Sequence, residues 1–222
     1  MTRCILTDIE GTTTSVSFVY DTLFPYFVEH IDSLLAMQDK PEVRDTFAAI
    51  RTEQQLANDE AVLDRLRQWV AEDRKETHLK TLQGIVWQQA YLSGAIKGHV
   101  YPDVAPCLER WYAEGRQLAV YSSGSVAAQK LLFGYSEAGD LTPLFSAYFD
   151  TKVGHKRESD AYRTIGSELN LPASDILFLS DVEAELDAAA AAGLHTLQLV
   201  RAGTTPGTRH ATVSSFDDIQ LD

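Results

Sequence analysis

Short apolar runs that end in polar residues recur along the chain and predict buried strands. They are Cys4–Thr7, Leu118–Tyr121, Ala147–Phe149, Ile176–Leu179 and His195–Val200. Helical segments separate most of the later runs. Short apolar strands that alternate with helices are typical of a parallel sheet covered on both faces. The pattern therefore predicts an α/β fold with a Rossmann-like parallel sheet and helices on both faces.

The stretch between the first two runs has the spacing of helices. Apolar residues recur every four positions from Val19 to Leu35, which predicts one long helix. Further helices are expected from Pro41, over Val62–Val70, over Leu79–Val86, and after Asp103, which is expected to cap a short helix. We therefore expect an all-helical cap domain at residues 16–95, inserted into a core domain of residues 1–15 and 96–222.

Polar side chains gather where the predicted strands end. They are Asp8, Glu10, Ser122, Ser123, Asp150 and Asp181, with Lys152 and Lys156 just beyond the third strand. In open parallel sheets, ligands bind at the carboxyl ends of the strands, because loops and helix N-termini converge there. This convergence is the main sign of function in the sequence.

Asp8 and Glu10 lie two positions apart in a turn that also contains Gly11. A carboxylate can attack a phosphoryl group and form an aspartyl-phosphate, while a second carboxylate moves protons. A glycine lets the backbone turn closely around an anion. The structural alternative is an acidic turn with threonine capping, and the pair by itself does not displace that alternative.

Asp181 and Glu185 lie about one turn apart at the start of an Ala-rich helix that ends at Gly193. The two carboxylates are placed to share a cation, and oxygen ligands without His or Cys suit Mg²⁺. Acidic charge at a helix N-terminus is the alternative explanation. We favour that explanation for Glu183 and metal binding for Asp181.

The segments around Ser122 and Lys156 are candidates for phosphate binding. Ser122–Ser125 fits an N-cap, and its hydroxyl and backbone N–H groups are also suited to hold phosphate oxygens. One of Lys152 and Lys156 is expected to offset the charge of the carboxylates and of a transferring phosphoryl group. The other is expected on the surface.

Composition narrows the classes of function and partner. Hydrophobic residues make up 45% of the chain and charged residues 23%, which is typical of a globular protein. The formal net charge of −13 argues against a nucleic-acid partner. No apolar run approaches the roughly 18 residues of a membrane helix, so no membrane partner is expected. Cys4 and Cys107 form no CxxC pattern, and we expect the protein to be located in a reducing cytoplasm.

The order of these motifs resembles that of the haloacid-dehalogenase-like phosphatases. These have a strand-end Asp-x-acidic-Gly-Thr, a strand-end Ser, a downstream Lys and a strand-end acidic pair. In more detail, four segments resemble the enolase-phosphatase family of methionine salvage: Ile5–Thr13, Tyr121–Ser125, Phe149–Lys156 and Leu177–Val182. The resemblance extends from the first strand to about Val200. It implies a core of the haloacid-dehalogenase type, one Mg²⁺ per subunit and a monomer.

The resemblance also implies the reaction. The family enolises 2,3-diketo-5-methylthiopentyl-1-phosphate and then dephosphorylates it to the acireductone 1,2-dihydroxy-3-keto-5-methylthiopentene. Asp8 would be the nucleophile and a metal ligand, and Asp181 a further metal ligand. Glu10 would transfer protons and contribute its backbone region to the metal site.

The remaining implied roles concern the substrate. Ser122 and Ser123 would bind phosphate or substrate, and Lys156 would bind the substrate and neutralise charge during catalysis. Glu10 stands where the superfamily usually has a second Asp. Because Glu is one methylene longer, we hypothesise that it suits proton abstraction next to a carbonyl.

Three other functions are compatible with parts of the pattern. A general Mg²⁺-dependent phosphatase of another small metabolite is the nearest. A metal-free dehalogenase is disfavoured, because Glu10 and Asp181 would place uncompensated negative charge beside Asp8. A non-catalytic sensor of a phosphometabolite would have little use for a free nucleophile.

Overall fold

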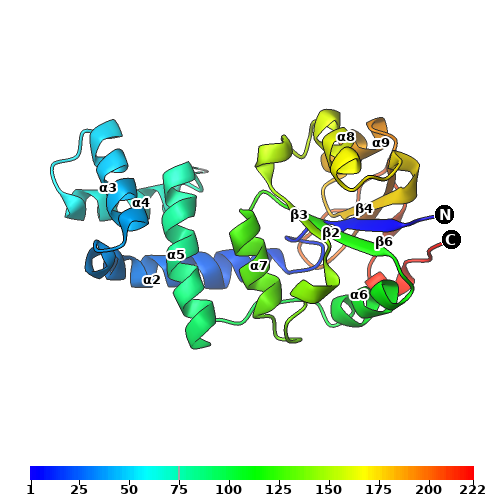
Figure 1. Ribbon diagram of the computed structural model, residues 1–222, viewed down its shortest axis with the longest axis horizontal. Coiled ribbons are helices and arrows are strands. Elements are labelled where there is room, and N and C mark those ends of the chain that lie inside the picture. Colours follow the sequence, from blue (N-terminus) through cyan, green and yellow to red (C-terminus); the bar gives the residue numbers. More distant parts are fainter. Residues whose placement is uncertain (75) are drawn as a thin grey trace. The chain divides into compact units, whose positions relative to one another are not determined.

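The computed structural model describes residues 1–74 and 76–222, and contacts divide the chain into two compact units. One unit comprises Met1–Val16 and Lys97–Asp222, and the other comprises Ser17–Ile96. Each unit has a hydrophobic core of its own. Figure 1 labels the helices and strands of both units.

Six parallel strands form the sheet of the first unit in the order β3-β2-β1-β4-β5-β6. Their bounds are β1 Cys4–Thr7, β2 Gln117–Tyr121, β3 Ala147–Phe149, β4 Ile176–Ser180, β5 His195–Leu199 and β6 Thr212–Val213. The predicted parallel sheet is confirmed, and five of the strands were expected. The sequence analysis missed β6, because a strand of 2 residues carries too little apolar pattern to stand out.

Helices cover both faces of this sheet, as predicted. Helices α8 (Ser159–Glu168) and α9 (Glu183–Ala191) lie on one face, and α6 (Val104–Ala113) and α7 (Val126–Gly134) lie on the other (Figure 1). Short 3₁₀ turns occur at Thr142–Leu144, Thr151–Val153, Ala173–Asp175 and Phe216–Asp218. Because the strands are parallel, the connections that follow them leave the sheet at one carboxyl edge, and the candidate polar residues lie there.

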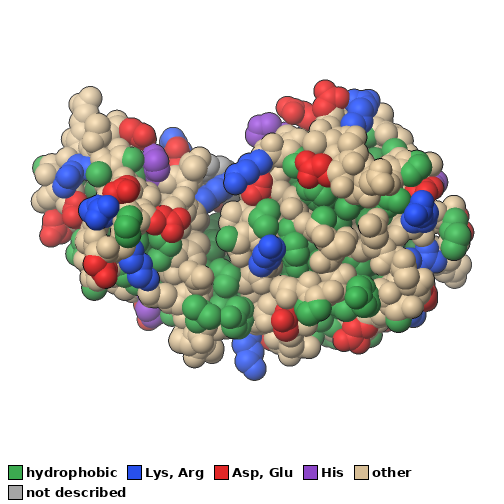
Figure 2. Space-filling model, viewed as in Figure 1, with side chains coloured by type: hydrophobic (Ala, Val, Ile, Leu, Met, Phe, Trp, Pro, Cys, Tyr) green, Lys and Arg blue, Asp and Glu red, His purple; other side chains and the backbone are tan. Residues whose placement is uncertain are grey.

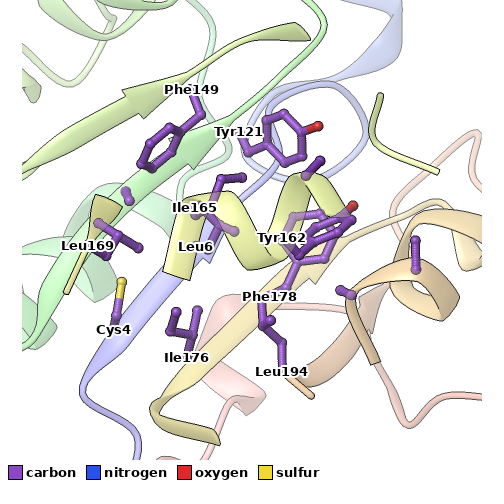
Figure 3. Close-up of a cluster of buried hydrophobic side chains, with 14 of the residues drawn as sticks. Cys4, Leu6, Tyr121, Phe149, Tyr162, Ile165, Leu169, Ile176, Phe178 and Leu194 are labelled. Carbon is purple, nitrogen blue, oxygen red and sulfur yellow. The ribbon is translucent and has the colours of Figure 1, made fainter. Parts of the chain in front are cut away.

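The core beneath α8 positions a loop that carries candidate site residues. Tyr121, Tyr162 and Phe178 are fully buried there, with the Tyr162 ring 5.5 Å from the Tyr121 ring and 5.1 Å from the Phe178 ring (Figure 3). The hydroxyl of Tyr121 donates a hydrogen bond to the Gly154 carbonyl at 2.8 Å. The hydroxyl of Tyr162 donates to the Lys156 carbonyl at 2.7 Å. The hydrophobic core thus holds the backbone of the 154–156 segment.

The second unit is helical throughout its described residues. Its elements are α1 (Val16–Phe18, which begins at the unit boundary), a π-helical turn Val19–Leu23, α2 (Phe24–His30), a 3₁₀ segment Ile31–Met37, α3 (Pro41–Glu53), α4 (Asp59–Ala71) and α5 (Thr77–Ser93). The prediction of one regular helix from Val19 to Leu35 is wrong. A spacing of four exceeds the 3.6 residues of an α-helical turn, and the chain changes helix type twice along this stretch. Leu34 is consequently buried, whereas Leu35 is 37% exposed.

The surface carries charges of both signs. Figure 2 shows Asp and Glu side chains mixed with Lys and Arg across the visible face. Exposed pairs such as Arg67 with Asp32 and Arg209 with Asp187 contribute little to stability, because water screens both charges. Among the described residues, every helix is too short or too polar to cross a lipid bilayer. Cys4 and Cys107 are free, buried thiols.

Candidate active site

Asp8 and Asp181 lie at the topological switch point of the sheet, where the order of the strands reverses. Asp8 directly follows β1 and Asp181 directly follows β4, and these two strands are neighbours. From β1 the sheet continues through β2 to β3, and from β4 it continues through β5 to β6. Ligands bind at such a switch point in open α/β sheets. The Asp8 amide donates to the Leu179 carbonyl at 2.8 Å, which holds the two strand ends together.

The structure brings Lys156 into contact with Asp8. The Lys156 Nζ atom lies 2.7 Å from Asp8 Oδ2 and 2.6 Å from Glu185 Oε2. The three side chains are only 9%, 6% and 12% exposed, respectively. Lys152 is exposed. The structure thus places Lys156, the lysine that the resemblance assigned to charge neutralisation, against two carboxylates, and leaves Lys152 at the surface.

Ser180 connects the two carboxylates that hold this lysine. Its hydroxyl is fully buried, 3.3 Å from Asp8 Oδ2 and 3.1 Å from Glu185 Oε2. The Val182 amide donates to the same oxygen at 3.1 Å. We call Asp8, Lys156, Ser180, Asp181 and Glu185 the lysine cluster.

The lysine cluster contains more negative than positive charge. Burial, followed by the charge of Asp8, raises the pKa of Asp181 to about 7. The same two causes raise the pKa of Glu185. Burial alone would lower the pKa of Lys156, but Asp8 and Glu185 more than offset it, so the pKa lies above its ordinary value. One ammonium group thus contacts two carboxylates, with the third, that of Asp181, close by.

Gly11 allows Asp181 to approach the turn that follows β1. Its backbone has φ of +73°, and a Cβ atom at this position would lie 2.3 Å from Asp181 Oδ2. Any other residue would therefore displace Asp181. Glu10 is half-buried on the same turn, and its backbone pairs with that of Thr14. The amides of residues 12–14 all donate to the Ile9 carbonyl, which makes the turn compact.

The carboxylates fit a hard divalent cation. Within residues 1–74 and 76–222, no three His, Cys, Asp or Glu side chains form a complete ligand set. Mg²⁺ does not need one, because it keeps several waters and binds one or two carboxylates together with substrate phosphate. Asp8 and Asp181 supply two carboxylates from neighbouring strand ends. Burial, followed by the charge of Asp8, disfavours the ionised form of Asp181, and a cation held by the two carboxylates would offset both effects.

The two glutamates near Asp181 have other partners. Glu185, which we considered as a second ligand with Asp181, is bound to Lys156. Glu183 accepts hydrogen bonds from the Thr208 and Arg209 amides at 2.6 and 2.8 Å. Glu183 therefore serves the loop after β5, in agreement with the structural role favoured for it.

Ser122 and Ser123 differ in their surroundings. Ser122 is buried after β2, and its Oγ accepts a hydrogen bond from the Gly124 amide at 3.1 Å. The Ser122 hydroxyl donates no hydrogen bond to any of the described residues, so its O–H group remains able to donate one to a ligand. Ser123 is exposed. The helix cap is Ser125, whose side chain accepts from the Ala128 amide at 3.2 Å.

Gln129 is a polar core residue that the sequence analysis missed. It is 1% exposed, and its side-chain nitrogen donates to the carbonyls of Gly124 and Phe149, both at 2.8 Å. It therefore connects the loops after β2 and β3. Asp150 also serves these loops, because its carboxylate accepts from the Lys152 and Val126 amides. A lone glutamine on an apolar helix was the available signal.

A second buried ion pair lies beyond β5, and its arginine was also missed. Arg201 Nη2 lies 2.7 Å from Asp103 Oδ2, and the side chains are 7% and 11% exposed. Asp103 stands at the N-terminus of α6 but does not cap it, so that prediction is wrong. Its carboxylate accepts instead from Arg201, Ser215 and the Phe216 amide. We call Arg201, Asp103, Tyr101 and Ser215 the arginine cluster.

These partners change the titration of Asp103. Burial acts to raise its pKa, but hydrogen bonds from Arg201 and from the Phe216 amide outweigh burial, and the pKa is lowered. Arg201 was inconspicuous in the sequence because it simply follows a strand. No spacing indicated that it would meet Asp103, which lies 98 positions earlier.

Comparison with known proteins identifies relatives along the whole chain. Residues 2–193 match the haloacid dehalogenase-like hydrolase family. The enolase-phosphatase E1 of Erwinia tasmaniensis is 53% identical over 222 residues, which cover 99% of this chain and 97% of that protein. The enolase-phosphatase E1 of Pseudomonas aeruginosa is 55% identical over 223 residues, with 99% of each chain covered.

A solved structure agrees with these matches. The crystal structure of the UTR4 protein of Saccharomyces cerevisiae superposes with a TM-score of 0.84 at 36% identity. The superposition covers 99% of this chain and 100% of that one. The likeness therefore extends over both units and is not confined to the sheet.

Proposed function

The chain belongs to the enolase-phosphatase E1 family of haloacid dehalogenase-like hydrolases, and from this premise we propose how its residues carry out the reaction. The protein is an acireductone synthase, a phosphatase that first enolises its substrate. The substrate is 2,3-diketo-5-methylthiopentyl-1-phosphate, and the product is 1,2-dihydroxy-3-keto-5-methylthiopentene. The observation that supports the site assignment is the buried contact of 2.7 Å between Lys156 and Asp8 at the switch point.

We assign Asp8 as the nucleophile. Its Oδ1 accepts from the Ile9 amide at 2.7 Å, and its Oδ2 faces Lys156 and Ser180, so the carboxylate is held in one orientation. In the phosphatase step a carboxylate oxygen bonds to phosphorus while the bond from phosphorus to the substrate oxygen breaks. Glu10 protonates that leaving oxygen and then takes a proton from the water that hydrolyses the aspartyl-phosphate.

We assign phosphate binding to Ser122, Ser123 and Lys156. The Ser122 hydroxyl is already oriented by the Gly124 amide and retains its proton for a phosphate oxygen. The Lys156 ammonium neutralises charge as the phosphoryl group approaches Asp8. Gln129 fixes the backbone that carries Ser122, which keeps these donors in place.

The family implies a divalent metal, and we propose one Mg²⁺ per subunit. Asp8, Asp181 and the backbone region of Glu10 would hold it. When bound, the cation would neutralise the excess carboxylate charge and polarise the phosphoryl oxygens. The close packing of Asp181 on Gly11 supports this ligand set, because it fixes one carboxylate beside the turn that carries the other.

We further propose that residues 16–95 are the cap domain and residues 1–15 and 96–222 the core domain. The separate hydrophobic core of the helical unit supports this division. Caps exclude water during turnover. We also propose a cytoplasmic monomer without nucleic-acid or membrane partners, which two free buried thiols and a net charge of −13 support. Light scattering of the purified protein tests the monomer.

The first experiment supplies the diketo-phosphate to the purified protein and records two signals. The ultraviolet absorbance of the enediol reports enolisation, and released orthophosphate reports hydrolysis. Both are expected with Mg²⁺, and both should disappear with a chelator. Phosphate release without an enediol signal would indicate the alternative, a general phosphatase of another small metabolite. The absence of both signals would contradict the proposed function.

The role of Glu10 is tested by its shorter homologue. Glu10→Asp is expected to slow enolisation more than hydrolysis of a simple phosphate ester, because the shorter side chain withdraws from the carbon acid. The two rates are measured on the same preparation. Equal losses in both would count against a special role of the longer carboxylate in enolisation.

A further inference from the structure

We propose that Arg201 is a positioning residue for the turn that carries Asp8 and Glu10, and that it acts as a unit with Asp103. The proposal rests on the function proposed for those two carboxylates. Arg201 itself follows β5, which is separated from β1 in the sheet by β4. It therefore acts on the reaction through the backbone of the turn.

The guanidinium group holds three separate segments at fixed angles. Nε donates to the Thr12 carbonyl at 3.3 Å, Nη1 to the Ser214 carbonyl at 3.0 Å, and Nη2 to Asp103 at 2.7 Å. Its carbon lies 4.3 Å from the centre of the Tyr101 ring. A planar fork of donors stacked on an aromatic ring fixes directions as well as distances. A lysine at this position would supply the charge without that geometry.

The turn depends on these outside contacts. Each of the four residues after Gly11 has a partner outside the turn: Thr12 O with Arg201, Thr13 O with the Tyr101 amide, the Thr14 hydroxyl with the His99 carbonyl, and the Ser15 amide with His99 Nδ1. Arg201 thus acts on the turn twice, directly at Thr12 and through the tyrosine ring on which it stacks.

Strand β5 also supports the segment that carries Asp181. Gln198, in β5, is 1% exposed, and its side-chain nitrogen donates to the Asp181 carbonyl at 2.7 Å. Its side-chain oxygen accepts from the Gly207 amide at 2.7 Å. The end of β5 and the segment after it therefore hold the backbones of both acidic segments, one through Gln198 and the other through Arg201.

The contribution of Arg201 is geometric. Its charge is balanced locally by Asp103, so a loss of Arg201 perturbs the position of the turn more than the charge of the site. A misplacement of about 1 Å can reduce turnover on the order of 100-fold. Because Arg201 lies apart from the phosphate-binding segments after β2 and β3, the affinity for substrate should change much less than the rate.

The test uses the full-length protein with three variants. Arg201→Lys keeps the charge, Arg201→Met removes it, and Asp103→Asn removes the partner. Arg209→Met is the matched control, because Arg209 pairs with Glu183 and Asp187 on the surface near the same strand. We expect Arg201→Lys to lower kcat by about 10- to 100-fold with KM changed less than about threefold. Asp103→Asn should lower kcat in the same direction, and Arg209→Met should not.

A second readout is independent of activity. Hydrogen exchange followed by mass spectrometry should be faster in the peptide that covers residues 9–16 for Arg201→Lys and Asp103→Asn, and unchanged for Arg209→Met. Folded Arg201→Lys with wild-type kcat, or with unchanged exchange in this peptide, would overturn the proposal. If the wild-type protein showed neither enolisation nor phosphate release, the proposed function would fail while the exchange experiment still tested the anchoring of the turn.

Discussion

The lysine cluster and the arginine cluster are both buried, but they balance their charges differently. Lys156 faces the carboxylates Asp8 and Glu185, with Asp181 close by, whereas among the described residues Arg201 forms an ion pair with Asp103 alone. Burial, followed by the charge of Asp8, raises the pKa of Asp181 to about 7, whereas hydrogen bonds from Arg201 and from the Phe216 amide outweigh burial and lower the pKa of Asp103. Buried charge in excess indicates a site that binds a further charged group, whereas balanced charge is typical of a structural contact.

The two cations also suit their tasks. Lys156 is a compact charge on a flexible stem, which can follow a phosphoryl group as it moves. Arg201 is a planar fork that holds three backbone or side-chain acceptors at fixed angles. The comparison therefore distinguishes the cluster to which we assign the chemistry from the cluster to which we assign the positioning of the turn.

The largest expected effect comes from removing Asp8, the proposed nucleophile in the lysine cluster. Asp8→Asn should lower phosphate release by at least about a thousandfold, because the amide cannot form the phosphoryl intermediate. The fold should survive, since the change is nearly isosteric and removes one of the excess negative charges. Steady-state assays and thermal unfolding measure the two effects. A variant that keeps most of its phosphatase activity would exclude the covalent mechanism.

The next effect compares the two cations directly. Lys156→Met and Arg201→Met should each cost about 3–5 kcal/mol of unfolding free energy in chelator, because each leaves buried carboxylate charge unpaired. Added Mg²⁺ should restore more stability to Lys156→Met than to Arg201→Met, since the proposed metal ligands Asp8 and Asp181 belong to the lysine cluster. Denaturant unfolding with and without Mg²⁺ measures both. Equal recovery in the two variants would contradict the distinction between the clusters.

A smaller effect is the pH dependence of stability in chelator. The raised pKa of Asp181, about 7, means that its contribution to stability is present below its unfolded pKa of about 3.9 and is lost as the pH rises towards 7. The lowered pKa of Asp103 means that its contribution is present above about pH 4 and is lost as the pH falls through the folded-state pKa.

These opposite signs are measured with two variants. The difference in unfolding free energy between the wild type and Asp181→Asn should fall between about pH 4 and pH 7, whereas the difference for Asp103→Asn should stay constant there and shrink at lower pH. Slopes of the same sign for the two variants would show that the clusters are not electrostatically different.

The smallest effect concerns one serine in each cluster. Ser215→Ala removes a hydrogen bond to Asp103 and should cost about 1 kcal/mol of stability, with kcat changed less than about twofold. Ser180→Ala removes the hydroxyl between Asp8 and Glu185 and should lower kcat by more than Ser215→Ala does. Unfolding and steady-state kinetics on both variants provide the comparison. A larger loss of kcat in Ser215→Ala than in Ser180→Ala would contradict the distinction between the two clusters.

The sequence by itself determined most of the strands and helices and which polar residues end the strands. Apolar runs are local signals, so five of the strands and the helical composition of the second unit could be predicted from them. Parallel strands share one carboxyl edge, so the placement of Asp8, Ser122 and Asp181 after their strands followed directly. Gly11 was also recognisable, because a backbone that must turn closely requires glycine.

Only the tertiary structure decided which of these side chains meet. It paired Glu185 with Lys156 and placed Asp103 in an ion pair with Arg201 in place of the expected helix cap. Such contacts join segments far apart in sequence and depend on loop paths and rotamers, which local patterns of polarity do not encode. The sequence therefore determined the edge of the sheet where the chemistry lies, and packing decided the partners of each charge.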